Sequence, residues 1–200
     1  MKSSLFIAED FYKDPLSVRW DALKGIESHG IYETGFSGRL IGKFESIIGE
    51  PITKYGSVND RYMKSNGAFT MFHLGQHRSR HFASSIHHDQ GAYEFVGLVY
   101  LSPSAPYEAG TSFWEHKETG LFSYPSPSDA RRLGYSISEL VALLARDGGN
   151  RMKWNELDRV GNKFNRAVVF RAARLHSASR IFGGNNRTGR LTQTFNFSTL

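Results

Sequence analysis

The order of apolar and polar residues along the chain predicts a sheet-rich fold flanked by a few helices. Short runs that alternate between apolar and polar residues, or that are rich in β-branched and aromatic residues, are typical of strands. Strands are therefore expected over 68–74, 93–101, 110–116, 155–160, 165–171 and 190–197. Strands of this length and spacing are typical of a sandwich or barrel, so the chain is predicted to be mainly β.

Two segments carry the signals that begin a helix. Asp14 and Pro15 stand at the positions of a cap and a first-turn proline, which predicts a helix that begins near Pro15. Ser136 and Glu139 have the spacing of a capping box, and the apolar segment after them ends at Gly148. We expect both helices to pack on the outside of the sheets.

Two shorter segments complete the expected elements. Residues 44–48 precede Gly49, which predicts a short helix with a glycine stop. Residues 124–129 contain Pro125 and Pro127 and are predicted to form a lid or a linker.

Composition indicates one globular domain over residues 1–200. With 40% hydrophobic and 14% aromatic residues the chain is unlike a disordered protein, and no apolar run approaches the ~20 residues of a membrane-spanning helix. The absence of cysteine excludes disulfides and thiolate ligands, so any metal must be held by His, Asp or Glu. The first apolar patch is interrupted at Glu9, so no secretion signal and a cytoplasmic location are expected.

The net charge of +6 favours an anionic partner, either nucleic acid or an acidic small molecule. Many of the arginines lie in the last third of the chain, but they are scattered and never form a run of five. Scattered charges of this kind usually form a solvated surface. A small-molecule partner is therefore predicted rather than nucleic acid, and the oligomeric state is left open.

The segment 84–91 concentrates side chains that can bind a metal. Alternate residues of an extended strand point to the same side, so His87 and Asp89 would face one space and His88 the other. One imidazole and one carboxylate so placed are two of the three ligands of a 2-His-1-carboxylate facial triad, which leaves open positions on non-heme Fe(II). His176 is the best candidate for the third ligand.

A second constellation lies in the last predicted strand. Arg190 and Thr192 share one face of it and present a guanidinium fork beside a hydroxyl. This pair has the chemistry of a carboxylate clamp. Arg187 is the nearest alternative cation, and the sequence does not choose between the two arginines.

His-x-Asp, a later histidine and an Arg-x-Thr beyond it resemble the motif order of the iron(II)- and 2-oxoglutarate-dependent oxygenases. More closely, the sequence is similar to a small bacterial and phage-associated branch of 2-oxoglutarate–Fe(II) oxygenase-like proteins. The segments that carry this resemblance are 10–19, 86–89, 97–101, 110–114 and 164–166, followed by His176. Together they span nearly the whole chain, which makes the ordered set more specific than His-x-Asp alone.

The resemblance implies a double-stranded β-helix, the jelly-roll or cupin-like fold. It implies that His87, Asp89 and His176 hold Fe(II), that Arg190 and Thr192 bind the distal carboxylate of 2-oxoglutarate, and that O2 takes the last position. The implied activity is hydroxylation of a C–H bond in a small molecule or amino-acid-like substrate, with release of succinate and CO2. Related halide-transferring enzymes have Gly or Ala in place of Asp89, so its presence favours hydroxylation, while desaturation and ring closure stay open.

The sequence also fits other interpretations. A non-redox, cupin-like metal-binding protein or isomerase would use the same fold and ligand types. Nucleic-acid dealkylation is disfavoured because the C-terminal segment lacks the arginine-rich run expected of that branch. A different, histidine-rich site is suggested by six histidines that lie close together in the sequence: His73, His77, His81, His87, His88 and His116.

Overall fold

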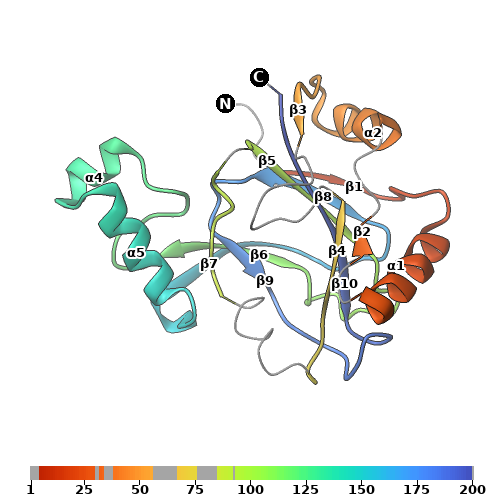
Figure 1. Ribbon diagram of the computed structural model, residues 1–200. Helices are drawn as coiled ribbons and strands as arrows, with labels where there is room; N and C mark the ends of the chain where they lie inside the picture. Colours follow the sequence, from red (N-terminus) through yellow and green to blue (C-terminus); the bar gives the residue numbers. More distant parts are fainter. Residues whose placement is uncertain are drawn as a thin grey trace.

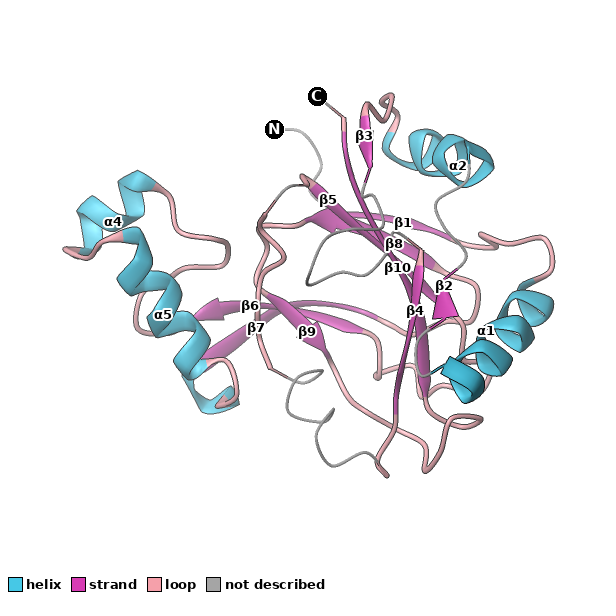
Figure 2. Ribbon diagram, viewed as in Figure 1, coloured by secondary structure: helices cyan, strands magenta, loops and turns pink. Residues whose placement is uncertain are grey.

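The computed structural model describes residues 5–29, 32–33, 38–55, 67–75, 85–91 and 93–199. Within these residues, two antiparallel sheets form the body of the molecule and the helices lie outside them (Figures 1 and 2). The protein is therefore mainly β with flanking helices, as the spacing of apolar residues predicts.

The larger sheet has seven strands among the described residues, in the order β1-β8-β5-β10-β4-β2, with β3 paired to β10. Their bounds are β1 Leu5–Ala8, β2 Tyr32–Glu33, β3 Lys54–Tyr55, β4 Ala68–Phe72, β5 Phe95–Tyr100, β8 Ala167–Arg171 and β10 Arg190–Ser198. The long strand β10 pairs with both β4 and β5, and Thr192 stands opposite Thr70 on one side and Tyr100 on the other.

The smaller sheet has the order β7-β6-β9, with β6 at Thr111–His116, β7 at Trp154–Val160 and β9 at His176–Ala178. His87 extends this sheet by an isolated antiparallel bridge to His176. The sheet therefore brings the His-x-Asp segment next to the late histidine.

The chain crosses repeatedly between the two sheets. It runs from β4 in the larger sheet to the His87 bridge, to β5, to β6 and β7, to β8, to β9, and back to β10. This alternation between two facing antiparallel sheets is the double-stranded β-helix, or jelly roll. The predicted fold class is confirmed.

Alternate residues of the larger sheet face different apolar layers, as the period of two requires. Tyr100 and Phe170 pack between the sheets against Phe113 of β6. On the opposite face, helices α1 (Pro15–His29) and α2 (Gly38–Ile48) cover the sheet with a second apolar layer. Gly97 permits this contact, because a Cβ there would lie only 2.7 Å from the ring of Phe44.

A pair of helices packs at one end of the smaller sheet (Figure 1). They are α4 (Pro127–Leu133) and α5 (Ile137–Asp147), and the 3-10 turn Arg151–Lys153 leads from them into β7. Leu140 and Leu144 of α5 bury against Trp114 and Trp154. The predicted capping box of Ser136 with Glu139 begins α5.

Some expectations need correction. The segment 124–129 is not irregular throughout, because Ser126 and Asp129 form a capping box that begins α4. Pro127 stands at the start of this helix, where a proline is compatible with helical backbone. The sequence pattern does not predict the short strands β1 and β9, which form by pairing with β8 and β6. Among the described helices, none is long and apolar enough to cross a membrane.

Candidate metal centre

The side chains of His87, Asp89 and His176 converge between the two sheets. Their ligand atoms all lie within 4.8 Å of one another. Nε2 of His176 lies 3.3 Å from one oxygen of Asp89, and Nε2 of His87 lies 3.8 Å from the other. The structure therefore brings together the three residues that the sequence nominates.

Backbone hydrogen bonds from three parts of the chain hold this cluster. His87 exchanges both backbone hydrogen bonds with His176, and the amide of Asp89 donates to the carbonyl of Ala172 at 2.8 Å. One residue earlier, the amide of Ile86 donates to the carbonyl of Gly148 at the end of α5. The expected strand over 84–91 is reduced to the single bridge at His87; Ser84 lies outside the described residues.

The two imidazoles are held in the same tautomer. Nδ1 of His87 lies 2.9 Å from the carbonyl of Ser85, and Nδ1 of His176 lies 2.9 Å from the carbonyl of Arg174. Because a carbonyl only accepts, both Nδ1 atoms carry the proton and donate it, so the lone pair of each ring is on Nε2. Both lone pairs then face the carboxylate of Asp89.

The electrostatics favour a charged carboxylate and a neutral imidazole. Burial opposes the charge on Asp89, but in the metal-free protein a hydrogen bond donated by His176, which requires a second proton on that ring, and the nearby histidines outweigh burial and lower the pKa of Asp89 to about 2. Burial, followed by the neighbouring His176, lowers the pKa of His87. Both groups are therefore deprotonated near neutral pH, which is the state that binds a metal ion.

This donor set fits a divalent transition metal ion. The separations of 3.3 and 3.8 Å between the Nε2 atoms and the carboxylate oxygens are short enough for the three residues to share one ion. Two imidazole nitrogens and one carboxylate oxygen on one face suit Fe(II) with open positions, and also suit Mn, Co, Ni and Zn. His87, Asp89 and His176 would hold it.

Arg190 is a buried cation beside Tyr100, which packs between the sheets. Its residue is 4% exposed, and burial lowers the pKa of its guanidinium. In the part of the chain that the structure describes, no carboxylate pairs with it, its Nε has no hydrogen-bond partner, and Nη2 makes a long 3.4 Å contact to the carbonyl of Gly110. A buried charge of this kind requires an anion.

The surroundings of Arg190 supply further polar groups. Thr192 is buried on the same face of β10. Tyr100, opposite Thr192, has its ring 5.6 Å from the guanidinium, and its hydroxyl is hydrogen-bonded to Thr111 at 2.7 Å. Sequence reasoning did not identify Tyr100 and Thr111; the period-two pattern of 95–100 places Tyr100 on the inner face, but only the strand pairing puts it beside Arg190.

Arg187 has a different environment. Its residue is exposed, and its backbone carbonyl accepts a hydrogen bond from the buried guanidinium of Arg19. Between the two arginines that the sequence left open, the geometry therefore favours Arg190 as the buried anion site.

A second group, His116, Glu118 and Asp147, also has its ligand atoms within 4.8 Å. His116 is fully buried, with Nε2 3.2 Å from Asp147 and Nδ1 3.0 Å from the hydroxyl of Thr119. Asp147 also accepts from Arg146 at 2.9 Å. The hydrogen bonds of His116 are therefore satisfied within the protein.

Two further histidines of the described residues have their rings engaged within the protein. The ring of His88 packs edge-on against Tyr124, with centroids 4.8 Å apart. Nδ1 of His73 accepts from the amide of Gly75. His77 and His81 lie outside the described residues.

Three solved structures illustrate what this chain is similar to in three dimensions. A prolyl hydroxylase from Trichoplax adhaerens, in complex with a hypoxia inducible factor peptide fragment, aligns with a TM-score of 0.49 and 11% identity over 98% of this chain and 84% of its own. HygX from Streptomyces hygroscopicus, with nickel and 2-oxoglutarate bound, aligns with a TM-score of 0.47 and 10% identity over 98% of this chain and 82% of its own. A Pseudomonas putida prolyl-4-hydroxylase aligns with a TM-score of 0.44 and 11% identity over 97% of this chain and 87% of its own. The jelly-roll assignment stands on the sheets of this chain itself.

Sequence comparison identifies a family for this chain but no individual relative. No curated protein matches the sequence. The model of DUF6445, a family of unknown function, matches residues 34–197, which is most of the chain. The protein is therefore a member of the DUF6445 family.

Proposed function

We propose that this protein is an Fe(II)- and 2-oxoglutarate-dependent dioxygenase, with residues 1–200 forming one such domain. The reaction we propose is hydroxylation of a C–H bond in a small molecule or amino-acid-like substrate, with release of succinate and CO2. One observation carries the proposal: a His–Asp–His cluster and a buried arginine without a carboxylate partner, among the described residues, lie between the same two sheets.

Each residue has a definite part in this proposal. His87, Asp89 and His176 bind the metal through two Nε2 lone pairs and one carboxylate. Arg190 neutralises the distal carboxylate of 2-oxoglutarate, and Thr192 adds one hydrogen-bond donor. Bound Fe(II) would supply the activation of O2 coupled to decarboxylation of 2-oxoglutarate.

The apolar surroundings of the cluster have a role as well. The rings of Phe170 and His176 are 4.6 Å apart, and Phe113 packs against Phe170 on the side of the smaller sheet. These rings keep water from one side of His176 and fix the orientation of its imidazole. In a drier site, the attraction between Arg190 and a carboxylate is also stronger.

Formation of succinate tests the proposal directly. Purified protein with Fe(II), ascorbate and 2-oxoglutarate should release succinate, and chelation by EDTA should stop it. A non-redox metal-binding protein or isomerase, the alternative function, would bind the metal and leave 2-oxoglutarate unchanged. Absence of succinate above the level of an Asp89→Ala protein would refute the oxygenase.

A matched pair of arginine variants tests the cosubstrate site. Arg190→Lys keeps the charge but loses the planar fork, so the apparent KM for 2-oxoglutarate should rise about tenfold or more. Arg187→Lys, on the exposed surface, should leave that KM unchanged. The opposite result would move the cosubstrate site to Arg187.

A further inference from the structure

The guanidinium of Arg190 is held by few hydrogen bonds of its own. In the part of the chain that the structure describes, its Nε has no hydrogen-bond partner, and Nη2 makes a long 3.4 Å contact to the carbonyl of Gly110. The ring of Tyr100 lies 5.6 Å from it. A side chain held this loosely takes its direction from its backbone, so the bonds that fix the chain around Arg190 decide where the cation lies.

Ser102 holds both neighbours of Arg190 in the chain. Its hydroxyl donates to the carbonyl of Gly189 at 2.8 Å and accepts from the amide of Leu191 at 2.9 Å. The registered pairing of β5 with β10 ends before this point, and Pro103, which follows, has no amide to extend it. The buried hydroxyl of Ser102 therefore takes the place of the backbone ladder where Arg190 begins β10.

Arg19 bonds to the same part of the chain from α1, the helix on the outer face of the larger sheet. Nη1 donates to the carbonyl of Leu101 at 2.7 Å, and Nη2 donates to the carbonyl of Arg187 at 2.5 Å. The amide of Leu101 in turn donates to the carbonyl of Leu191 at 2.9 Å. The guanidinium of Arg19 therefore joins the end of β5 to the turn before β10, three residues from Arg190.

The burial of Arg19 is not explained by packing alone. The residue is 9% exposed, and burial lowers the pKa of its guanidinium. Among the described residues no carboxylate pairs with it, so carbonyl oxygens compensate its charge. An apolar side chain would pack against the other buried residues of α1 without burying a charge. The two carbonyls that Arg19 joins therefore account for a guanidinium at this position.

We propose that Ser102 and Arg19 are positioning residues that aim the guanidinium of Arg190 at the distal carboxylate of 2-oxoglutarate. The inference rests on the proposed function and adds two residues to the cosubstrate site. The hydroxyl of Ser102 and both terminal nitrogens of Arg19 are engaged with backbone groups. Both residues therefore act through the backbone of residues 187–191 and not by contact with the cosubstrate.

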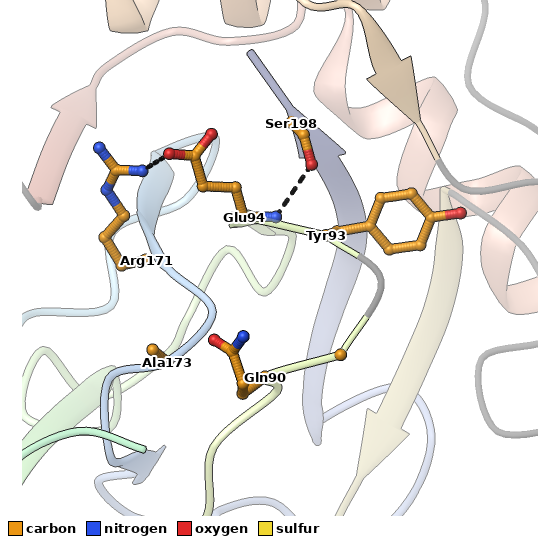
Figure 3. A pocket seen from close by; sticks show the side chains of 7 residues that line it. Gln90, Tyr93, Glu94, Arg171, Ala173 and Ser198 are labelled. Carbon is orange, nitrogen blue, oxygen red and sulfur yellow. Dashed lines mark hydrogen bonds and ion pairs between the residues drawn. The ribbon is translucent and has the colours of Figure 1, made fainter. Parts of the chain in front are cut away.

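The pocket in Figure 3 is a different part of the molecule and supplies a control. Its volume is about 410 Å³, and its lining includes none of Ser102, Arg19 and Arg190. Arg171 of β8 lies in its wall, where it pairs with Glu94. Arg171→Leu therefore removes a partly buried arginine of the larger sheet that has no bond to the segment around Arg190.

Calorimetric titration of the Zn(II)-loaded protein measures the effect without turnover. The two ligands are 2-oxoglutarate and 2-oxopentanoate, which has the same chain length but no distal carboxylate. The wild type should bind 2-oxoglutarate at least tenfold more tightly, because only this ligand pairs with Arg190. Ser102→Ala and Arg19→Leu should each reduce that preference about fivefold or more. Their affinities for 2-oxopentanoate and for Zn(II) should stay those of the wild type.

Arg19→Lys tests whether the donors of Arg19 matter rather than its volume. The ammonium keeps the charge and can donate to a carbonyl, but it lacks the fork that spans two. The preference for 2-oxoglutarate should therefore fall less in Arg19→Lys than in Arg19→Leu. Equal losses in the two variants would overturn the role given to Arg19.

Ser126→Ala is the matched control for Ser102→Ala. The hydroxyl of Ser126 also donates one hydrogen bond and accepts another, both with Asp129 at the start of α4. This variant should lose stability and keep the full preference for 2-oxoglutarate, and so should Arg171→Leu. A loss of preference in either control as large as that in Ser102→Ala would overturn the proposal, because it would follow from stability alone.

A double-mutant cycle tests whether Ser102 acts through Arg190. In an Arg190→Gln protein the cation is absent, so the further change Ser102→Ala should alter the affinity for 2-oxoglutarate less than about twofold. An equal loss in the presence and absence of Arg190 would show that Ser102 acts by another route, and the proposal would fail.

The same titrations separate this inference from the proposed function. A preference for 2-oxoglutarate that persists in Ser102→Ala and Arg19→Leu would overturn the inference and leave the oxygenase intact. A preference that these variants lose, in a protein that never forms succinate, would refute the oxygenase and not the positioning residues. A wild type without any preference would overturn the cosubstrate site at Arg190 and the inference with it.

Discussion

The cluster of His87, Asp89 and His176 and the cluster of His116, Glu118 and Asp147 hold the same kinds of side chain at similar separations. Their hydrogen bonds differ. In the first cluster both Nδ1 protons go to backbone carbonyls, so two lone pairs and a carboxylate face one another and require a cation. In the second cluster the imidazole, the hydroxyl of Thr119 and the carboxylate satisfy one another.

This comparison shows that residue type and spacing do not distinguish a metal site from a structural network. What distinguishes them is which atom each imidazole proton is bonded to and which group accepts it. Asp147 also receives the guanidinium of Arg146, which neutralises its charge without an ion. Among the described residues, the ionisable groups that act on Asp89 are histidines, and its pKa is about 2.

The two clusters are also mechanically connected through the end of α5. Asp147 anchors this end to His116 of β6, and the next residue, Gly148, accepts a hydrogen bond from Ile86 with its carbonyl. Ile86 directly precedes His87. The buried network therefore supports the segment that carries two of the three candidate metal ligands.

The largest expected effect is the loss of metal binding when a ligand of the first cluster is removed. Asp89→Ala and His176→Ala should each lower the affinity for Fe(II) or Zn(II) more than about 100-fold, beyond the effect of losing a hydrogen-bond partner of a ligand. Titration followed by calorimetry or metal analysis measures it. The Asp147→Asn protein should still bind one metal ion per chain. If Asp147→Asn abolished metal binding and Asp89→Ala did not, the second cluster would be the metal site and the first would not.

The next effect concerns stability. His116→Ala removes a ring that is fully buried against Trp154 and leaves Asp147 and Thr119 without their partner. The free energy of unfolding should fall by about 2–4 kcal/mol, measured by urea denaturation. Glu118→Gln changes an exposed member of the same group and should have an effect below about 0.5 kcal/mol. Equal effects of the two substitutions would show that the network contributes little.

A smaller effect is expected from pH. The pKa of Asp89 is lower in the folded protein than in the unfolded chain, so its charge adds stability above pH 4 that is lost as the pH falls to 2. The shift corresponds to about 2 kcal/mol. In the metal-free protein, unfolding free energies between pH 5 and 2 should decline less steeply for Asp89→Asn than for the wild type. Parallel curves would contradict the charge interaction between Asp89 and the histidines.

The smallest effect tests the connection between the clusters. A Cβ on Gly148 would lie 2.5 Å from the carbonyl oxygen of Ile86, so Gly148→Ala must displace the segment before His87. Metal affinity should fall by up to about tenfold, the range seen when the support of a ligand is disturbed. Gly149→Ala is the matched control, since a Cβ there would have no atom within 4 Å. Equal affinities in the two variants would argue that α5 does not position His87.

Local pattern was sufficient for much of the fold. The strands β4, β5, β6, β7, β8 and β10 and the starts of α1 and α5 lie where alternation and capping predicted them, because these signals depend on residues close together in sequence. The short strand β9 has only three residues and no period of its own. It exists because His176 pairs with both His87 and β6.

For the candidate site, the sequence by itself determined which side chains have ligand chemistry and which ones share a face of a strand. The tertiary structure decided the rest: the tautomers of His87 and His176, the burial of Arg190 rather than Arg187, and the closed network around His116. These properties depend on partners far away in the chain. A proton on Nδ1 or a charge in an apolar layer is set by which carbonyl or ring comes to lie beside it, and only the packing of the two sheets determines that.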